Sequence, residues 1–382
     1  MRLYRVLFVS GLLMFLCIQP RIPAERAAGT KDISDEAGAS LNLVWKRPLG
    51  VPVSLSSSPN GKYIVFVSKD GKLLCLGDGG KTVWKLLLPG IDCAAVGTDG
   101  SAIAFSYLNL IDTTAYFISP SGKLLWRHSV KGAVWSASAS EEPGRFAVGT
   151  GERYCYIYTI SERRHRYRRW KLAGVPNSIK FSADGNSVIF GSWQDAGVGA
   201  YSLEGTKMAW HSGKPDRLYS VDISPSGDFA LVTARPNRNS PECSVHLKDA
   251  GLNELWVKEF QGYGLTADLD RAGRFVAVGY QKSIVHKDKE VQENHIVLLD
   301  RSGKLVWEKG GMFGDWNLLQ ACADGRLLLY DNTGHIYILS RSGKVLLRDK
   351  LPATVRKFVR IPSRTTVVIS CGDGQLYRYA VR

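Results

Sequence analysis

A short polar turn followed by an apolar, β-forming run recurs along this chain of 382 residues and limits its fold more than any other feature. Turns rich in Gly, Pro, Asn, Asp and Ser that alternate with such runs are typical of antiparallel strands. Eight copies lie at residues 58–68, 98–106, 140–150, 182–192, 224–233, 270–280, 323–330 and, in degraded form, 362–370.

A second motif alternates with the first and consists of a turn glycine followed four or five residues later by a large apolar residue, usually tryptophan. Glycine is favoured where a hairpin turn needs a positive φ. The turn glycines are Gly80, Gly122, Gly205, Gly251, Gly303 and Gly343. The column of large residues reads Trp45, Trp84, Trp126, Trp170, Trp210, Trp256, Trp307 and Leu347.

Repeats of about forty to fifty residues with four short strands each are the signature of propeller blades. A single four-stranded sheet cannot bury both faces, so blades stack around an axis with a large residue between neighbours. We therefore interpret the tryptophans as packing residues rather than as a ligand cage. The sequence predicts an all-β fold, an eight-bladed β-propeller of four-stranded antiparallel blades over residues 42–382.

The chain ends predict how the ring closes. Trp45 lies in LNLVWKRPLG with no partner strands before it, whereas the last copy ends at GQLYRYAV without a fourth strand. We expect the N-terminal strand to complete the eighth blade, which hides two strand edges.

The N-terminus has the layout of a secretory signal peptide. The basic MRLYR is followed by thirteen apolar residues, Val6 to Ile18, which is shorter than a membrane-spanning helix needs. We predict a signal peptide at residues 1–24, with an uncleaved anchor as the alternative, and a flexible linker at residues 25–41. The residue before Cys17 is Leu16, where lipoprotein signals carry a small residue, so lipidation is not expected.

The formal charge is +15, and removing Arg2, Arg5 and Arg21 with the signal leaves it strongly basic. Such a charge favours anionic partners. The other six cysteines are scattered, with no CxxC pair. This predicts buried small hydrophobes rather than a zinc site, and leaves one or two disulfides open.

Two groups of segments carry a family resemblance. SPSGKLLW (119–126) and DRSGKLVW (300–307) resemble the tryptophan-docking repeats of quinoprotein-like propellers. AVWSASASEEPGRFAVGT and LYSVDISPSGDFALVT resemble the inner hairpin of WD-repeat propellers. Quinoprotein dehydrogenases hold a quinone with calcium, and many have a Cys-Cys pair, which this sequence lacks together with CxxCH. The resemblance therefore implies no cofactor, and the non-catalytic periplasmic propellers that help to assemble outer-membrane proteins are closer in character.

The predicted blade architecture also indicates a binding face. With strands lettered A to D from the channel outward, the uniform A–B and C–D turns share one face, and the variable B–C and D–A loops share the other. The longest variable segment is 280–295. Insertions on one face of a repeat protein usually mark the binding surface.

At that face the residues just before the inner strands form a column, which reads Val53, Cys93, Trp135, Asn177, Tyr219, Leu265, Asn317 and Arg356. D–A loops add Lys214, Asp216, Arg217, Tyr263, Asp315 and Trp316. We expect a rim that holds a peptide or polar ligand, with an ordinary wet rim as the alternative. The predicted rim residues are Trp135, Asn177, Arg217, Tyr219, Tyr263, Asp315, Trp316, Asn317 and Arg356.

One outer hairpin breaks the repeat with SERRHRYRRWK. Such a basic run predicts either a patch for anions or charge protection of an exposed strand edge. Its cations are Arg163, Arg164, Arg166, Arg168, Arg169 and Lys171.

No enzyme motif stands out. The seven histidines show no metal-ligand spacing, and GxSxG is absent. His128, placed at the start of a D–A loop, and His286 are the first suspects if a reaction exists. The sequence favours a non-catalytic, secreted or periplasmic scaffold for a protein or surface glycan, without cofactor, metal or a retained membrane span. The alternatives are a quinoprotein-like enzyme and a polyanion-binding surface protein, with nucleic acid the least favoured anion.

Overall fold

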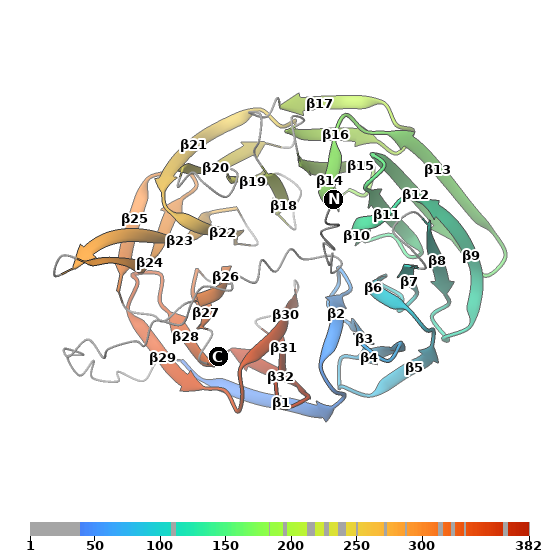
Figure 1. Cartoon of the computed structure of the whole chain (residues 1–382), viewed down its shortest axis with the longest axis horizontal. Helices are drawn as coiled ribbons and strands as arrows, with labels where there is room; N and C mark the ends of the chain where they lie inside the picture. The colour runs from blue at the N-terminus through green and yellow to red at the C-terminus, as the bar shows by residue number, and fades with distance from the viewer. Residues whose placement is uncertain are drawn as a thin grey trace, which may run out of the picture.

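A computed structural model describes residues 39–107, 112–182, 184–193, 197–211, 218–224, 229–235, 242–249, 251–270, 273–286, 289–311, 316–321, 325–331, 334–361 and 366–381. The predictions for residues 1–24 and for most of the linker lie outside these ranges. Within them the chain forms strands and turns without a helix, and the strands make eight blades around a central axis (Figure 1).

In seven blades the four strands are consecutive in the chain, with the first strand nearest the axis and the last strand outermost. Blade 1 holds β2 (Pro52–Ser57), β3 (Tyr63–Ser68), β4 (Lys72–Gly77) and β5 (Thr82–Leu87). Blade 2 holds β6 (Ile91–Val96), β7 (Ala102–Tyr107), β8 (Asp112–Ile118) and β9 (Leu124–Lys131). Blade 3 holds β10 (Val134–Ala139), β11 (Arg145–Thr150), β12 (Tyr154–Ile160) and β13 (His165–Lys171). Blade 4 holds β14 (Val175–Phe181), β15 (Ser187–Trp193), β16 (Val198–Ser202) and β17 (Lys207–His211).

The second half of the ring repeats this order. Blade 5 holds β18 (Leu218–Ile223), β19 (Phe229–Arg235), β20 (Glu242–Asp249) and β21 (Glu254–Gln261). Blade 6 holds β22 (Tyr263–Leu269), β23 (Phe275–His286), β24 (Lys289–Asp300) and β25 (Leu305–Gly310). Blade 7 holds β26 (Trp316–Ala321), β27 (Leu327–Asp331), β28 (His335–Leu339) and β29 (Val345–Lys350). Blade 8 holds β30 (Val355–Ile361), β31 (Thr366–Cys371), β32 (Gln375–Val381) and, outermost, β1 (Leu41–Pro48).

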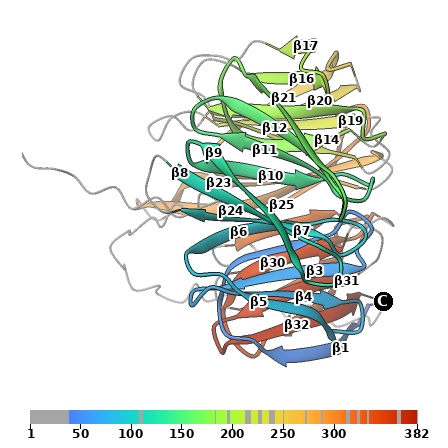
Figure 2. The same ribbon diagram turned by 90° about the vertical axis from the view of Figure 1, so that its right-hand side faces the viewer.

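The predicted closure is confirmed, because β1 pairs antiparallel with β32 from Leu41↔Val381 to Pro48↔Gln375. The two strands lie side by side in both views (Figures 1 and 2). Arg378 of β32 is almost fully buried, forms an ion pair with Asp78 of blade 1 and donates to the Asp78 carbonyl at 2.5 Å. The first and last blades are thus joined by a buried charge as well as by packing.

The tryptophan column packs between blades as expected. Trp45 lies on Gly80 of blade 1, and Trp256 lies on Gly303 of blade 6. The turn in blade 3 lacks the glycine, and there Trp126 stacks on His165 with ring centroids 4.1 Å apart. One turn prediction is wrong: in blade 5 the left-handed residue is Leu252 (φ 63°) and not Gly251, because the turn is shifted by one residue.

The core lies in the seams between neighbouring blades. Val65 and Leu73 of blade 1, for example, pack against Ala94 and Ala104 of blade 2. Each fully buried Val or Leu stabilises the fold by about 1.5 to 3 kcal/mol relative to exposure. Five cysteines fall within the described residues; none forms a disulfide, and all but the partly buried Cys93 are buried.

The long variable segment 280–295 is a β-hairpin rather than an irregular loop. β23 and β24 continue their pairing beyond the blade as far as His286↔Lys289. Ile284 pairs with Val291 in this extension.

Candidate functional site

The predicted rim column coincides with a bulge at the start of most inner strands. In β10, Val134 pairs with Thr150 and Ser136 with Gly149, so the strand register skips Trp135. Four other inner strands have the same irregularity, in which the pairing register passes over one residue. These residues are Asn177 in β14, Arg356 in β30, Asn317 in β26 and Val53 in β2. A bulge re-aims its side chain and ends regular pairing. The column residues therefore lie within the strands, at the mouth of the channel on the B–C and D–A face.

In three blades the bulge does not coincide with the aligned residue alone. In β6 the skipped residue is Asp92 rather than Cys93, and in β22 it is a pair that includes Leu265. In β18 the pairing is regular, and Tyr219 faces Ala234. A repeat alignment cannot locate a one-residue bulge, because the inserted residue leaves no mark in the spacing of the motifs.

Glycines in the B–C turns make room for two of the rim side chains. A Cβ on Gly151 would lie 2.7 Å from the Trp135 indole nitrogen, so the ring lies against the turn of its own blade. Arg356 lies in the same relation to Gly372 in blade 8, with its Nε 3.5 Å from the Cβ position. Both side chains therefore pack against the glycine backbone of a B–C turn.

One buried polar atom at the rim has no hydrogen-bond partner within the described structure. The Asn177 side-chain oxygen is buried and accepts no hydrogen bond from the described residues, an arrangement that costs free energy unless a ligand or water donates to it. Tyr263 is 40% exposed, and Arg356 is exposed. Burial raises the pKa of the Asp92 carboxyl above its ordinary value.

The structure brings four of the nine predicted rim residues to this mouth with described side chains, namely Trp135, Asn177, Tyr263 and Arg356. It gives only the backbone of Tyr219, Trp316 and Asn317, which begin β18 and β26. Arg217 and Asp315 lie outside the described residues.

Residues 165–171 of the predicted basic run form β13, whose side chains alternate between two faces, and Arg163 and Arg164 precede this strand. His165 stacks on Trp126, and the ring of Tyr167 lies 4.3 Å from that of His128 on the outer strand of blade 2. Arg169 lies over the Tyr154 ring at 5.4 Å. On the other face Arg168 pairs with Glu204 of blade 4 at 2.9 Å.

His128 lies in the middle of β9 and not at the start of a loop, which corrects the sequence prediction. Its Nδ1 is 3.0 Å from the Tyr158 hydroxyl. Burial lowers the pKa of His128, and the charges of Arg169 and His165 lower it further. A neutral imidazole held by a tyrosine in an aromatic seam is a packing residue. The His286 side chain lies outside the described part of the structure.

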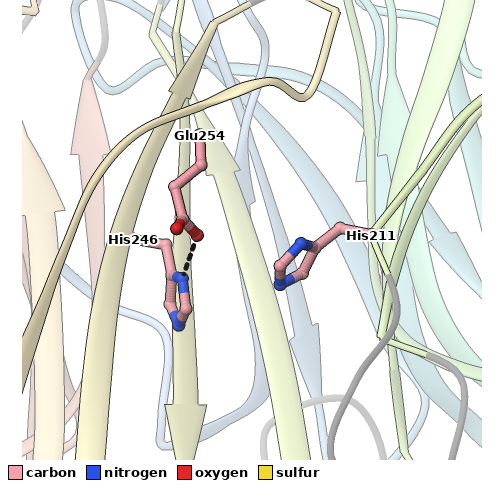
Figure 3. A group of neighbouring side chains, drawn as sticks. All are labelled: His211, His246 and Glu254. Atoms are coloured by element: carbon pink, nitrogen blue, oxygen red, sulfur yellow. Dashed lines mark hydrogen bonds and ion pairs between the residues drawn. The ribbon is translucent and has the colours of Figure 1, made fainter.

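A second cluster joins blades 4 and 5 and was not predicted (Figure 3). His211 ends β17, His246 lies in β20 and Glu254 begins β21, and their donor atoms all lie within 4.8 Å of one another. His246 Nδ1 is 2.8 Å from the Glu254 carboxylate. Two imidazoles and a carboxylate are a donor set that zinc accepts.

The fully buried Lys248 accounts for this cluster without a metal. Its ammonium nitrogen lies 3.3 Å from His211 Nδ1 and 3.4 Å from the Glu254 carboxylate. Burial lowers the pKa of His211, and Lys248 lowers it further. The hydrogen bond with His246 is the main reason that the pKa of Glu254 is lowered. The donors therefore surround the protein's own cation.

Comparison with known proteins agrees with this architecture. No protein-family model matches the sequence. The chain is 22% identical over 360 residues to the outer membrane protein assembly factor BamB of Burkholderia pseudomallei, covering 90% of this chain and 88% of that protein. The Dos1 propeller superposes with a TM-score of 0.68 at 10% identity, covering 89% of this chain and 95% of that one. Sqt1 of Saccharomyces cerevisiae superposes with a TM-score of 0.66 at 11% identity, covering 88% and 98%.

In sequence the chain is similar to this assembly factor, and in fold it is similar to solved β-propellers. The described part of this propeller contains no helix that is long and apolar enough to cross a bilayer.

Sequence reasoning missed Asp92, Lys248 and the histidine cluster of the propeller. The cluster draws its residues from two blades, and no local spacing marks it. The signal that was available is the break in the repeat at Lys248, where other blades carry apolar residues.

Proposed function

We propose that this propeller is a non-catalytic scaffold, exported through residues 1–24, that holds a protein partner at its B–C and D–A face. The proposal is supported by the bulges at the starts of the inner strands, which include Trp135, Asn177 and Arg356. Asn177 there keeps an unsatisfied carbonyl oxygen within the described structure. The name of the 22% identical relative, an assembly factor for outer membrane proteins, supports both a protein partner and an envelope location.

The opposite face uses its polar groups internally, which supports the choice of face. Asn60 of blade 1 donates to the Thr98 carbonyl of blade 2 at 2.7 Å. Thr98 donates to the Glu141 carbonyl of blade 3 at 3.0 Å, and Arg145 donates to the Gly185 carbonyl of blade 4 at 3.2 Å. Groups already paired between blades gain little from a partner, whereas the buried Asn177 side-chain oxygen at the rim has no donor within the described structure.

The experiment compares two double variants of the exported protein. We expect Trp135→Ala with Arg356→Ala to lower recovery of a stoichiometric co-purifying protein at least tenfold, because both side chains lie at the rim. A matched control, Lys62→Ala with Glu142→Ala on the opposite face, should leave recovery unchanged. Equal recovery from all three proteins would refute the proposed face.

Two outcomes favour the other functions. Rim-dependent retention on a surface glycan, with no protein recovered, would replace the protein partner by a glycan. A quinone absorbance band in the purified protein would replace the scaffold by a quinoprotein-like enzyme.

A further inference from the structure

The outer strands of seven blades share a bulge that blade 3 lacks. In blade 1, Trp84 pairs with Cys75 and Thr82 with Leu76, so Val83 is skipped. The skipped residues of the other six blades are all apolar and lie one residue before the tryptophan column, or two residues before it in the case of Met208. They are Val44, Leu125, Met208, Leu255, Val306 and Leu346. A bulge twists an outer strand and spoils its free edge for pairing with another chain.

β13 of blade 3 has a regular edge instead. It pairs with β12 without interruption from Tyr154↔Lys171 to Ile160↔His165. It is the last strand of its sheet, and no other strand of the described structure pairs with it. All its side chains are exposed except that of Trp170, which is half-buried. A regular, exposed edge is a template for an added strand.

Charge decides which strand this edge accepts. Arg166 and Arg168 share the face that carries Trp170, about 7 Å apart, since alternate residues of a strand point the same way. Arg166 has no hydrogen bond or ion pair within the described structure. The Arg168–Glu204 ion pair is more than 60% exposed on both sides, so it is weak and exchanges easily. A second copy of β13 would place arginine opposite arginine, which is unfavourable.

We propose that the edge of β13 binds an extended peptide segment with acidic residues at alternate positions, which adds to blade 3 as a fifth strand. Carboxylates two residues apart would match Arg166 and Arg168, and arginine binds a carboxylate in bidentate fashion. Residues between them would lie beside Tyr167, which is 44% exposed. Backbone hydrogen bonds between the peptide and β13 supply the affinity, and the alternate positions of the acidic residues in the peptide supply the selectivity. This surface is outermost in the ring, so the proposal stands or falls independently of the rim.

The test uses three fluorescent eight-residue probes on the full-length protein, read by anisotropy. The first alternates glutamate and valine. The second has the same residues in two blocks, and the third alternates them but is N-methylated on every second amide. We expect the alternating peptide to bind at least tenfold more tightly than either of the others, because only it offers both the charge spacing and the strand edge.

Two protein variants locate the site. Arg166→Gln with Arg168→Gln should weaken binding of the alternating peptide at least tenfold. Lys81→Gln with Lys85→Gln changes the same charge beside the bulged edge of blade 1 and should have no effect. These side chains are exposed, so the melting curves of both variants should nearly coincide with that of the wild type.

Three outcomes would overturn the proposal. Equal affinity for the block and alternating peptides would show diffuse attraction of anions. Full binding of the N-methylated peptide would exclude strand addition. Binding of anionic phospholipid vesicles that depends on Arg166 and Arg168, without peptide binding, would assign the strand to a membrane surface.

Discussion

At the scale of the residue, Lys248 shows how one charge replaces a core position of the repeat. Leu76, Ile118, Leu299 and Leu339 pair in the same register, opposite the residue before the outer-strand bulge. Lys248 pairs there with Glu254. A buried cation needs partners, because transfer of an unpaired charge from water is costly. His211, His246 and Glu254 supply them, so the cluster follows from the lysine.

Two substitutions in this cluster should therefore differ in their effects. Glu254→Gln leaves Lys248 buried without its counter-charge and should lower the free energy of unfolding by about 1 to 3 kcal/mol, the value for a partly exposed partner. Lys248→Leu restores the residue type of other blades and should stay within about 1 kcal/mol of wild type. Urea denaturation at pH 7.5 compares the two. A larger loss from Lys248→Leu than from Glu254→Gln would contradict this explanation.

The rim shows what can be learned about a residue from sequence. Trp135, Asn177 and Arg356 could be placed at one mouth by counting from the repeat motifs. Asp92 could not, because the bulge in β6 falls one residue earlier than the alignment puts it. Bulge positions depend on how each inner strand fits its neighbours, and this fit leaves no local pattern.

At the scale of the element, the outer hairpins are built around one contact between a tryptophan and a glycine. Gly303 has φ +79°, and a Cβ there would lie 2.9 Å from the Trp256 ring. Glycine is required at this position for two reasons: the backbone has a positive φ, and the indole leaves no room for a Cβ. Sequence spacing alone indicates the first requirement, but only the neighbouring blade imposes the second.

Alanine at two glycines separates these requirements. Gly303→Ala should lower the free energy of unfolding by about 2 to 4 kcal/mol, from left-handed strain and a displaced Trp256. Gly50 has a similar φ of +83° but nothing within 4 Å of its Cβ position, so Gly50→Ala should cost only about 1 kcal/mol. Denaturant melts of both variants measure the difference. Equal losses would mean that the indole moves aside freely.

The β23–β24 hairpin marks the limit of prediction for an element. Its length and polarity suggested a loop, yet the two strands pair to the tip of the described part. Alternating polar and apolar residues over so few positions fit an isolated ribbon and a loop equally well.

At the scale of the whole molecule, stability depends on joining the two ends of the chain. β1 comes from the N-terminus, and its partner β32 comes from the C-terminus. Asp78, Gly80 and Arg378 connect this composite blade to blade 1. The ring is therefore closed only after the whole chain has been placed.

Asp78→Ala tests the closing contact. Arg378 is 2% exposed in its side chain, and Asp78 is 39% exposed, so loss of the carboxylate should lower the free energy of unfolding by about 2 to 4 kcal/mol. Asp300→Ala, in the C–D turn of blade 6, removes only hydrogen bonds within its own turn and should cost about 1 kcal/mol. Hydrogen exchange should quicken in β1 and β32 for Asp78→Ala alone. Uniform quickening around the ring would argue against a local closing contact.

The sequence by itself determined the number of blades, the order of strands, the tryptophan packing and the closure by β1. These properties follow from short-range periodicity and turn chemistry, which recur in every copy of the repeat. Only the tertiary structure decided where the inner strands bulge, that β13 alone keeps a regular outer edge, and that Lys248 is held by residues of two blades. Each of these depends on contacts between segments far apart in the chain, and such contacts leave no pattern within a single copy of the repeat.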